Sequence, residues 1–98
     1  HFNQYRSPMD LTTAIAGAQP APAAYVVGPA DRTYLSKGSA RNLQERLRDH
    51  LAGRVSRTKN RRPLHLLYHR YFGNYPLARQ HEMYLKTGHG RAWLKTQL

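Results

Sequence analysis

The amino-acid sequence predicts one small α+β domain in a chain of 98 residues. Two short apolar segments, Tyr25–Val27 and Thr33–Ser36, flank a turn and predict a β-hairpin. Leucines then recur every four residues from Leu43 to Leu51, a spacing typical of a helix with one buried stripe. Residues 64–72 are rich in aromatic and aliphatic side chains and predict a third strand. The expected architecture is a three-stranded sheet flanked by helices, in the order β-β-α-β-α-α.

Glycine and proline residues mark the ends of the first elements. Gly28 and Pro29 end the first strand, and Asp31 and Arg32 lie in the turn that leads to the second. Gly53 follows the leucine stripe and is expected to end the first helix.

Two further helices are expected after the third strand. Asn74 precedes the first of them, Pro76 falls in its first turn, and Gly88 is expected just beyond its end. A last short helix would hold Trp93 and Leu94. The apolar face of the longer helix is expected to comprise Leu77, Tyr84 and Leu85.

The N-terminal segment differs in composition from the rest of the chain. Residues 12–24 are mostly Ala, Thr, Gly and Pro, and the prolines at 20 and 22 favour an extended backbone. We therefore expect an extended tail or linker over residues 1–22, with room for a short helix over 11–17, and a compact domain over residues 23–98. Because such a tail becomes ordered against a partner, other proteins of a large assembly are expected to contact it.

The charge balance indicates a polyanionic partner. The net charge is +11, from 16 Lys and Arg against 5 Asp and Glu, and a field of this sign favours DNA or RNA. No apolar run approaches the roughly 20 residues of a membrane span, and no helix combines a basic face with a broad apolar one, so a membrane partner is not expected. The chain has no cysteine, which excludes disulfides and thiolate zinc sites.

A basic, turn-prone loop runs directly into the third strand. It is expected to contact the phosphates of a nucleic acid, although a run of charge can also be simply solvated. The candidate nucleic-acid-binding residues are Arg57, Lys59, Arg61 and Arg62.

Three segments, in order, resemble the GIY-YIG nuclease family: residues 42–50, 58–64 and 82–95. The similarity is greatest to the small stand-alone bacterial members, which are related to the nuclease module of nucleotide-excision repair. In the signature that names the family, Tyr25 is kept in the first half and Gly38 in the second. Ala23 stands where the first glycine would be, and Ser36 stands where the second tyrosine would be.

The resemblance implies roles for individual residues in phosphodiester hydrolysis. Arg46 would steady the phosphate, Glu82 would hold one divalent metal ion (Mg or Mn), and Tyr25 would help to activate the water. His50 matches a position that is often histidine in relatives. Tyr34 precedes Ser36 by two residues, on the same strand face, and is a candidate to replace the missing phenol.

Each of these residues also has a structural alternative. Arg46 fits a surface arginine on a basic helix, and Tyr25 fits a core residue of a strand. Glu82 has the helical spacing to pair with Arg79 or Lys86.

Two functions fit the sequence. One is an active, divalent-metal-dependent endonuclease that hydrolyses phosphodiester bonds in DNA or RNA. The survival of Tyr25, Arg46, His50 and Glu82 favours it. The other is a nucleic-acid-binding protein with a degenerate site, serving as a structural RNA-binding component of a ribonucleoprotein such as an organelle ribosome. Ser36, in place of the second tyrosine, slightly favours this second function. Either function places the chain inside the cell, in the mitochondrial matrix or a bacterial cytoplasm.

Overall fold

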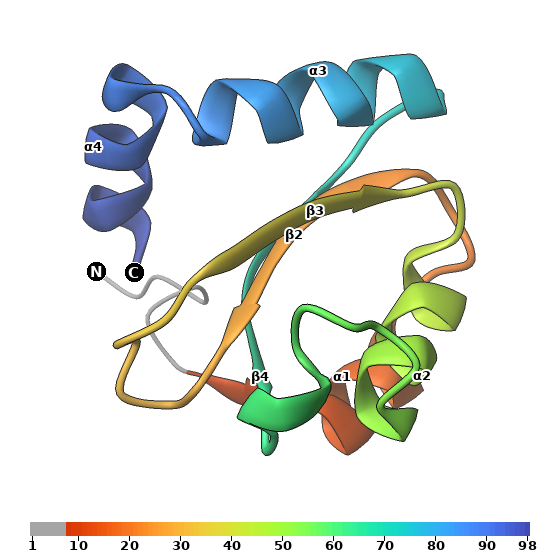
Figure 1. The fold of residues 1–98 in the computed structure, drawn as a ribbon. Helices are drawn as coiled ribbons and strands as arrows, with labels where there is room; N and C mark the ends of the chain where they lie inside the picture. Colours follow the sequence, from red (N-terminus) through yellow and green to blue (C-terminus); the bar gives the residue numbers. More distant parts are fainter. Residues whose placement is uncertain (1–7) are drawn as a thin grey trace.

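The structure, a computed structural model of the chain, describes residues 8–98. Its centre is a four-stranded antiparallel sheet in the order β1-β4-β2-β3, with helices on both faces (Figure 1). The strands are β1 (Met9–Asp10), β2 (Ala23–Gly28), β3 (Ser36–Ala40) and β4 (His65–Tyr71).

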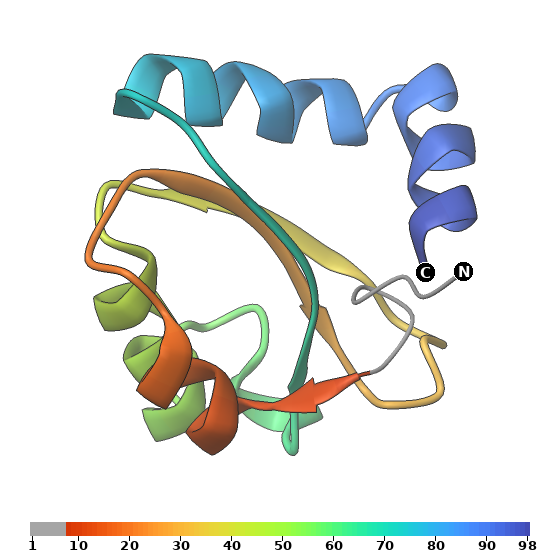
Figure 2. The ribbon, with the colours of Figure 1, turned by 180° about the vertical axis from the view of Figure 1, so that it is seen from behind.

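The helices form two layers that enclose the sheet. In Figure 1, α3 lies across one face with α4 at its end, and α1 and α2 lie side by side against the other face; Figure 2 shows the same layers from behind. The helices are α1 (Leu11–Gly17), α2 (Leu43–Ala52), α3 (Tyr75–Leu85) and α4 (Gly88–Gln97), with a short 3-10 turn, η2, at Lys59–Arg61. No helix in the described part of the chain is long and apolar enough to cross a membrane.

The strand β2 is buried on both faces because helices cover each side of it. All six of its residues are buried. Tyr25 and Val27 pack in one cluster with Leu43 and Leu47 of α2. Val26 faces the opposite way and packs with residues of β4, α3 and α4. This alternation directs the Tyr25 side chain toward α2.

The predicted α+β class is confirmed, but the sheet has four strands rather than three. The additional strand, β1, has only two residues and pairs Met9 with Leu66 and Asp10 with His65. Two residues are too few to produce an alternating pattern, so this strand could not be predicted from the sequence.

Residues 11–17 form a helix within the segment 1–22, over which an extended tail is expected; the first seven residues of that segment lie outside the described part. The Asp10 side chain caps α1 by accepting a hydrogen bond from the backbone N–H of Thr13. Leu11 and Ala14 are buried in the main core cluster. The short helix expected over 11–17 is therefore present, and it belongs to the packed domain.

Two expected helix faces differ from the observed ones. Leu51 and Leu77 are 44% and 46% exposed, and Tyr84 is 40% exposed. The polar residues His50 and Glu82 are buried instead. The helices turn these polar side chains inward, which a search for apolar stripes cannot find.

Two element boundaries also differ from the predicted ones. The second strand begins at Ser36, whereas the hairpin pattern placed it over Thr33–Ser36. Gly88 is the first residue of α4, because α3 ends at Leu85 with Lys86 as its cap.

Candidate functional site

A polar hollow of about 270 Å³ lies at the edge strand β3, where residues from α2 and α3 approach each other from opposite faces of the sheet. Asn42 caps the start of α2 and Asn74 caps the start of α3, which fixes where each helix begins. The hollow is lined by Tyr25, Gly38, Ser39, Arg46, Arg57, Tyr75, Arg79, Glu82 and Lys86.

Gly38 allows the phenol of Tyr25 to reach this hollow. Tyr25 lies on β2, one strand inward from the edge, and is paired with Gly38 on β3. A Cβ atom at position 38 would lie only 2.5 Å from the Tyr25 hydroxyl oxygen. Only glycine at this position leaves room for the phenol, which supplies a physical reason for the glycine of the signature.

The Tyr25 hydroxyl begins a chain of buried hydrogen bonds. Its oxygen lies 2.9 Å from Nε2 of His50, and Nδ1 of His50 lies 2.9 Å from Oγ1 of Thr58. Thr58 donates its own hydroxyl proton to the carbonyl of Val55, 3.5 Å away. Thr58 therefore accepts from Nδ1–H of His50, which leaves Nε2 as the acceptor for the proton of Tyr25.

Burial controls the charge of this pair. His50 is fully buried, and its burial, together with the nearby Arg46 and Arg57, lowers the pKa of its imidazole to about 4. Burial also raises the pKa of the Tyr25 phenol above its ordinary value, although Arg46 opposes that rise. At neutral pH the site therefore holds a protonated phenol against a neutral imidazole that can accept its proton.

Arg46 contacts the Tyr25 phenol and is also partly exposed to solvent. Its Nε donates to the Tyr25 hydroxyl oxygen over 3.4 Å. Its Nη1 lies 3.9 Å from one carboxylate oxygen of Asp49. Arg54 lies closer to that carboxylate, 2.9 Å from the other oxygen. The side chain of Arg46 is 38% exposed, so its guanidinium remains accessible to an anion that enters the hollow.

Glu82 also lines the hollow, and its carboxylate is nearly buried, with 7% of the side chain exposed. Ser39 and Arg79 both donate to Oε1, and the Lys86 ammonium lies 2.9 Å from Oε2. Burial alone would raise the pKa of this carboxyl, but the hydrogen bonds from these three residues together lower it.

Glu82 has the donor chemistry of a magnesium or manganese ligand. These ions are commonly held by one or two carboxylates, with water and substrate phosphate completing the octahedron. No group of three or more His, Cys, Asp or Glu side chains that could hold a metal occurs within residues 8–98. A site built on Glu82 would therefore depend on water and phosphate oxygens, and both carboxylate oxygens now contact cations of the protein.

Ser36 stands at the position of the missing second tyrosine, and Tyr34 is the candidate to replace its phenol. Both lie apart from the residues that line the hollow. Ser36 is buried, with 5% exposed, and pairs with Val27 of β2. The guanidinium of Arg61 lies 3.9 Å from the centre of the Tyr34 ring, and the Tyr34 hydroxyl donates to the Arg57 carbonyl. Neither side chain lines the hollow.

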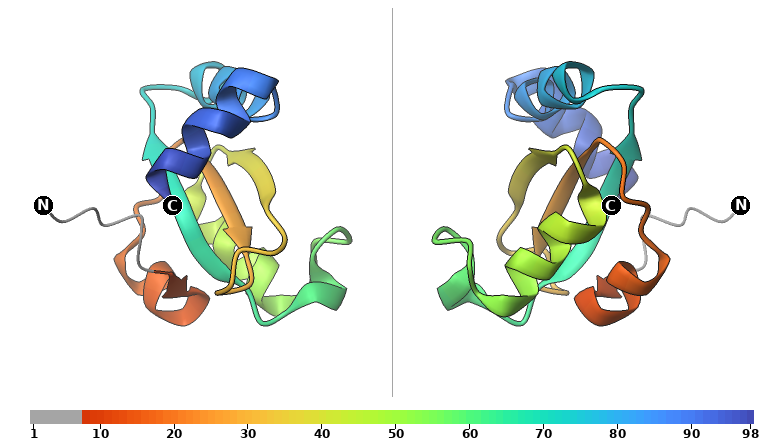
Figure 3. Two further views of the ribbon diagram at one scale, coloured as in Figure 1. Left: turned by 90° about the vertical axis from the view of Figure 1, so that its left-hand side faces the viewer. Right: turned by 90° about the vertical axis from the view of Figure 1, so that its right-hand side faces the viewer.

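The four basic residues of the loop have different surroundings. Arg57 lines the hollow, Lys59 is exposed at the tip, and Arg61 stacks on Tyr34. Arg62 instead donates to the backbone carbonyls of Lys59 and Leu51, which fixes the loop to the end of α2. Figure 3 shows this loop, in green, projecting away from the body of the domain.

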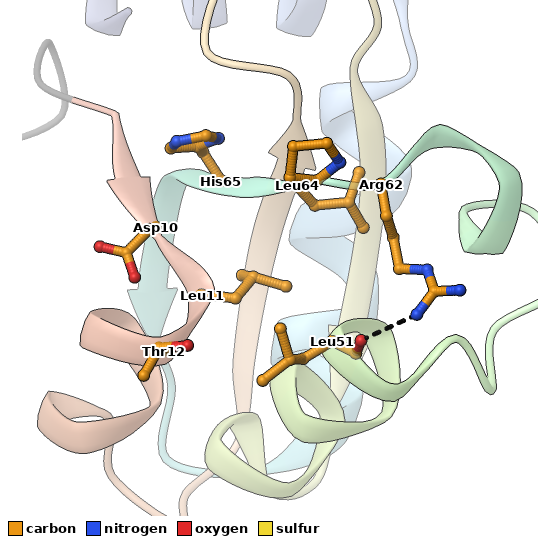
Figure 4. A pocket seen from close by; sticks show the side chains of 8 residues that line it. Asp10, Leu11, Thr12, Leu51, Arg62, Leu64 and His65 are labelled. Atoms are coloured by element: carbon orange, nitrogen blue, oxygen red, sulfur yellow. Dashed lines mark hydrogen bonds between the residues drawn. The ribbon is translucent and has the colours of Figure 1, made fainter.

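A second hollow of about 450 Å³ lies elsewhere, between α1, the end of α2 and the start of β4 (Figure 4). Leu11, Leu51, Arg62 and His65 are among its lining residues. None of the residues matched to the family site lines it, so the smaller hollow at β3 is the candidate site.

Several residues that orient the side chains of the site could not be predicted from the sequence. Thr58 orients His50, and Ser39 holds Glu82, but neither stands out from neighbouring polar residues in the chain. The helical spacings of three and four residues predict Arg79 and Lys86 only as structural partners of Glu82. That spacing was the one signal that could have found them.

Comparison with known proteins supports one relationship. A family profile described as the GIY-YIG catalytic domain matches residues 25–95, which is most of the chain. No curated protein and no solved structure matches significantly. The matched range contains Tyr25, Arg46, His50 and Glu82, the residues that meet around the hollow. The predicted resemblance is confirmed, and the chain belongs to the GIY-YIG nuclease family.

Proposed function

We propose that this protein is an endonuclease that hydrolyses phosphodiester bonds of DNA or RNA with the help of a divalent metal ion. The observation that carries the proposal is the position of the Tyr25 phenol, between the neutral imidazole of His50 and the guanidinium of Arg46. A tyrosine–histidine pair alone does not mark a site, since Tyr68 and His81 form one as well. Tyr25 differs because Arg46 also donates to its oxygen and because it lines the polar hollow.

This geometry supports the following proton steps. A water that attacks the phosphorus gives its proton to the Tyr25 oxygen, while the phenol gives its own proton to Nε2 of His50. Arg46 stabilises negative charge on the phenol oxygen as the proton leaves. Thr58 keeps the imidazole in the tautomer that can accept.

Besides proton transfer, phosphodiester hydrolysis requires stabilisation of the charged phosphate, which cationic side chains provide. Among the described residues, four of them line the hollow together with one carboxylate, that of Glu82, which Arg79 and Lys86 contact. Such an arrangement favours an anion in the ground state and favours the greater charge of the transition state still more. The four residues are Arg46, Arg57, Arg79 and Lys86.

A metal ion held at Glu82 would polarise the phosphate and assist the leaving oxygen. Among the described residues, Glu82 is the one carboxylate in the hollow that could hold the ion, and Ser39 orients that carboxylate by its hydrogen bond. Mg and Mn are the ions that suit this donor set.

A cleavage assay tests the proposal. Purified full-length protein is incubated with branched, single-stranded and duplex substrates of DNA and RNA, with Mg²⁺ or Mn²⁺. We expect cleavage of at least one substrate that EDTA and Glu82→Gln both abolish. Absence of cleavage from every substrate with either metal would contradict the proposal.

The second candidate function is a structural nucleic-acid-binding component of a ribonucleoprotein, such as an organelle ribosome. Ser36 and the cations that already contact both oxygens of Glu82 support it. The net charge of +11 would then serve binding alone, with RNA as the expected partner and the mitochondrion as one expected location.

The variant Ser36→Tyr separates the two candidates. It restores the second phenol of the signature, and it should raise the cleavage rate of an active enzyme whose proton transfer is incomplete. No cleavage from either the native protein or Ser36→Tyr, together with tight RNA binding, would favour the structural component.

A further inference from the structure

The side chains around Glu82 form a compact ion cluster that the family signature does not explain. The carboxylate is nearly buried and accepts from three donors, of which Arg79 and Lys86 are charged. The side chains of Arg79 and Lys86 are 52% and 41% exposed, so they reach from solvent to an acid below the surface. Ordinary ion pairs on a helix surface join two exposed groups and contribute little to stability.

The charges in this cluster do not balance. Arg79 and Lys86 share one carboxylate, while Arg46 and Arg57 line the same hollow. Glu82 is the only acidic side chain among the described residues that line it. Lys37, on the neighbouring strand, lies near Arg91 and Lys86, and its pKa is lowered by burial and by these two cations. The hollow therefore carries an excess of positive charge that an entering phosphate would neutralise.

We propose that Arg79 and Lys86 are phosphate-contacting residues that Glu82 holds in the free protein, so that the metal ion and the nucleic acid bind to the hollow together. The inference rests on the proposed function, because it takes the hollow to be a phosphodiester site.

The coupling follows from competition for one carboxylate. In the free protein, two cations contact Glu82 and oppose the approach of a divalent ion. A phosphodiester offers these cations new acceptors, and long, half-exposed Arg and Lys side chains can turn to reach them. Glu82 is then released to bind metal, and the phosphate adds oxygen ligands. By linkage, each ligand raises the affinity of the other by the same factor, typically 5- to 150-fold.

The experiment measures manganese binding at Glu82 in the presence and absence of nucleic acid. Mn²⁺ broadens the NMR signals of nearby backbone amides, and the signals of Ser39 and Glu82 report the site, with Gly53 at the end of α2 as a reference. Short single-stranded and duplex oligonucleotides are added to full-length Tyr25→Phe protein, in which turnover is suppressed. We expect selective broadening at Ser39 and Glu82 at about 10-fold lower Mn²⁺ when an oligonucleotide is bound.

Two variants test the role of the cations. Lys86→Met keeps the length of the side chain but removes its charge, and it should increase the Mn²⁺ affinity of the free protein about 10-fold. It should also weaken nucleic-acid binding about 10-fold and lower the slope of log K against log salt by about 0.7 to 0.9. Lys95→Met removes an exposed charge on α4, distant in the chain from Glu82, and should change neither the Mn²⁺ affinity nor the site-specific broadening.

The results separate this inference from the proposed function. Equal Mn²⁺ affinity at Glu82 with and without oligonucleotide, unchanged by Lys86→Met, would overturn the coupling even if the protein cleaves. Coupled binding by a protein that cleaves no substrate would support the assignment of Arg79 and Lys86 and would contradict only the catalytic proposal. If Lys86→Met and Lys95→Met bind nucleic acid with the same affinity and slope, Lys86 makes no phosphate contact.

Discussion

His50 is the residue whose charge state the structure constrains most strongly. Its pKa is lowered from 6.5 to about 4, so between these values the unfolded chain binds a proton that the folded protein does not. Folding stability should therefore be greatest above about pH 6.5 and should decrease as the pH falls toward 4, by about 2 to 3 kcal/mol.

The contribution of His50 can be measured by difference. Urea unfolding of the native protein and of His50→Gln is followed from pH 7.5 to pH 4.5. The native protein should lose more stability on acidification than the variant, because burial, Arg46 and Arg57 disfavour the charged imidazole, whereas Asp49 favours it. Parallel pH profiles for the two proteins would show that His50 is not held neutral.

Gly38 is the residue that gives Tyr25 its position. The variant Gly38→Ala places a methyl group 2.5 Å from the Tyr25 hydroxyl oxygen, so the ring must move away from His50. We expect a destabilisation of about 1 to 3 kcal/mol, the usual cost of overpacking, and a loss of cleavage. Gly73→Ala is the matched control, since nothing lies within 4 Å of its added Cβ. Similar thermal unfolding and cleavage for both variants would contradict this role.

At the scale of single elements, α1 is an integral part of the core. Leu11 is 2% exposed and packs with Leu43 and Leu47. Leu11→Ala should therefore lower the free energy of unfolding by about 2 to 5 kcal/mol. Leu77→Ala, at a site that is 46% exposed, should cost much less. If urea unfolding finds the two variants equally stable, the helix is not packed as described.

The basic loop divides into residues expected to bind phosphate and a residue that holds the loop. Arg57→Ala and Lys59→Ala should each lower the slope of log K against log salt by about 0.7 to 0.9. Arg62→Ala should mainly reduce stability, by about 1 kcal/mol, because it removes hydrogen bonds to two backbone carbonyls. A salt titration in which Arg62→Ala alone changes the slope would reverse these assignments.

For the molecule as a whole, the sequence predicted the class of the fold and the identity of the family. Helix and strand order could be predicted because glycines, prolines and apolar periodicities mark most elements. The strand β1 and the packing of α1 could not, since a pair of strand residues and a short Ala-rich helix carry too little pattern.

The candidate site, too, could be predicted only in part from patterns in the sequence. The family resemblance predicts roles for Tyr25, Arg46, His50 and Glu82. In the structure Tyr25, Arg46 and Glu82 line one hollow, and His50 contacts the Tyr25 hydroxyl. Their partners Ser39 and Thr58 depend on contacts across 43 and 8 residues of sequence, which no local pattern encodes. The burial of His50, and with it the lowered pKa, likewise emerges only when α2 packs against the sheet.

The central claim is that the Tyr25 phenol transfers a proton to His50 during phosphodiester hydrolysis. The most direct measurement is the single-turnover cleavage rate of Tyr25→Phe against that of the native protein, at saturating protein and fixed Mg²⁺. Tyr25→Phe removes one oxygen and should lower the rate by about 10² to 10⁴, whereas Tyr84→Phe, at an exposed tyrosine outside the hollow, should leave it unchanged. Equal cleavage rates for native protein and a correctly folded Tyr25→Phe would contradict the claim.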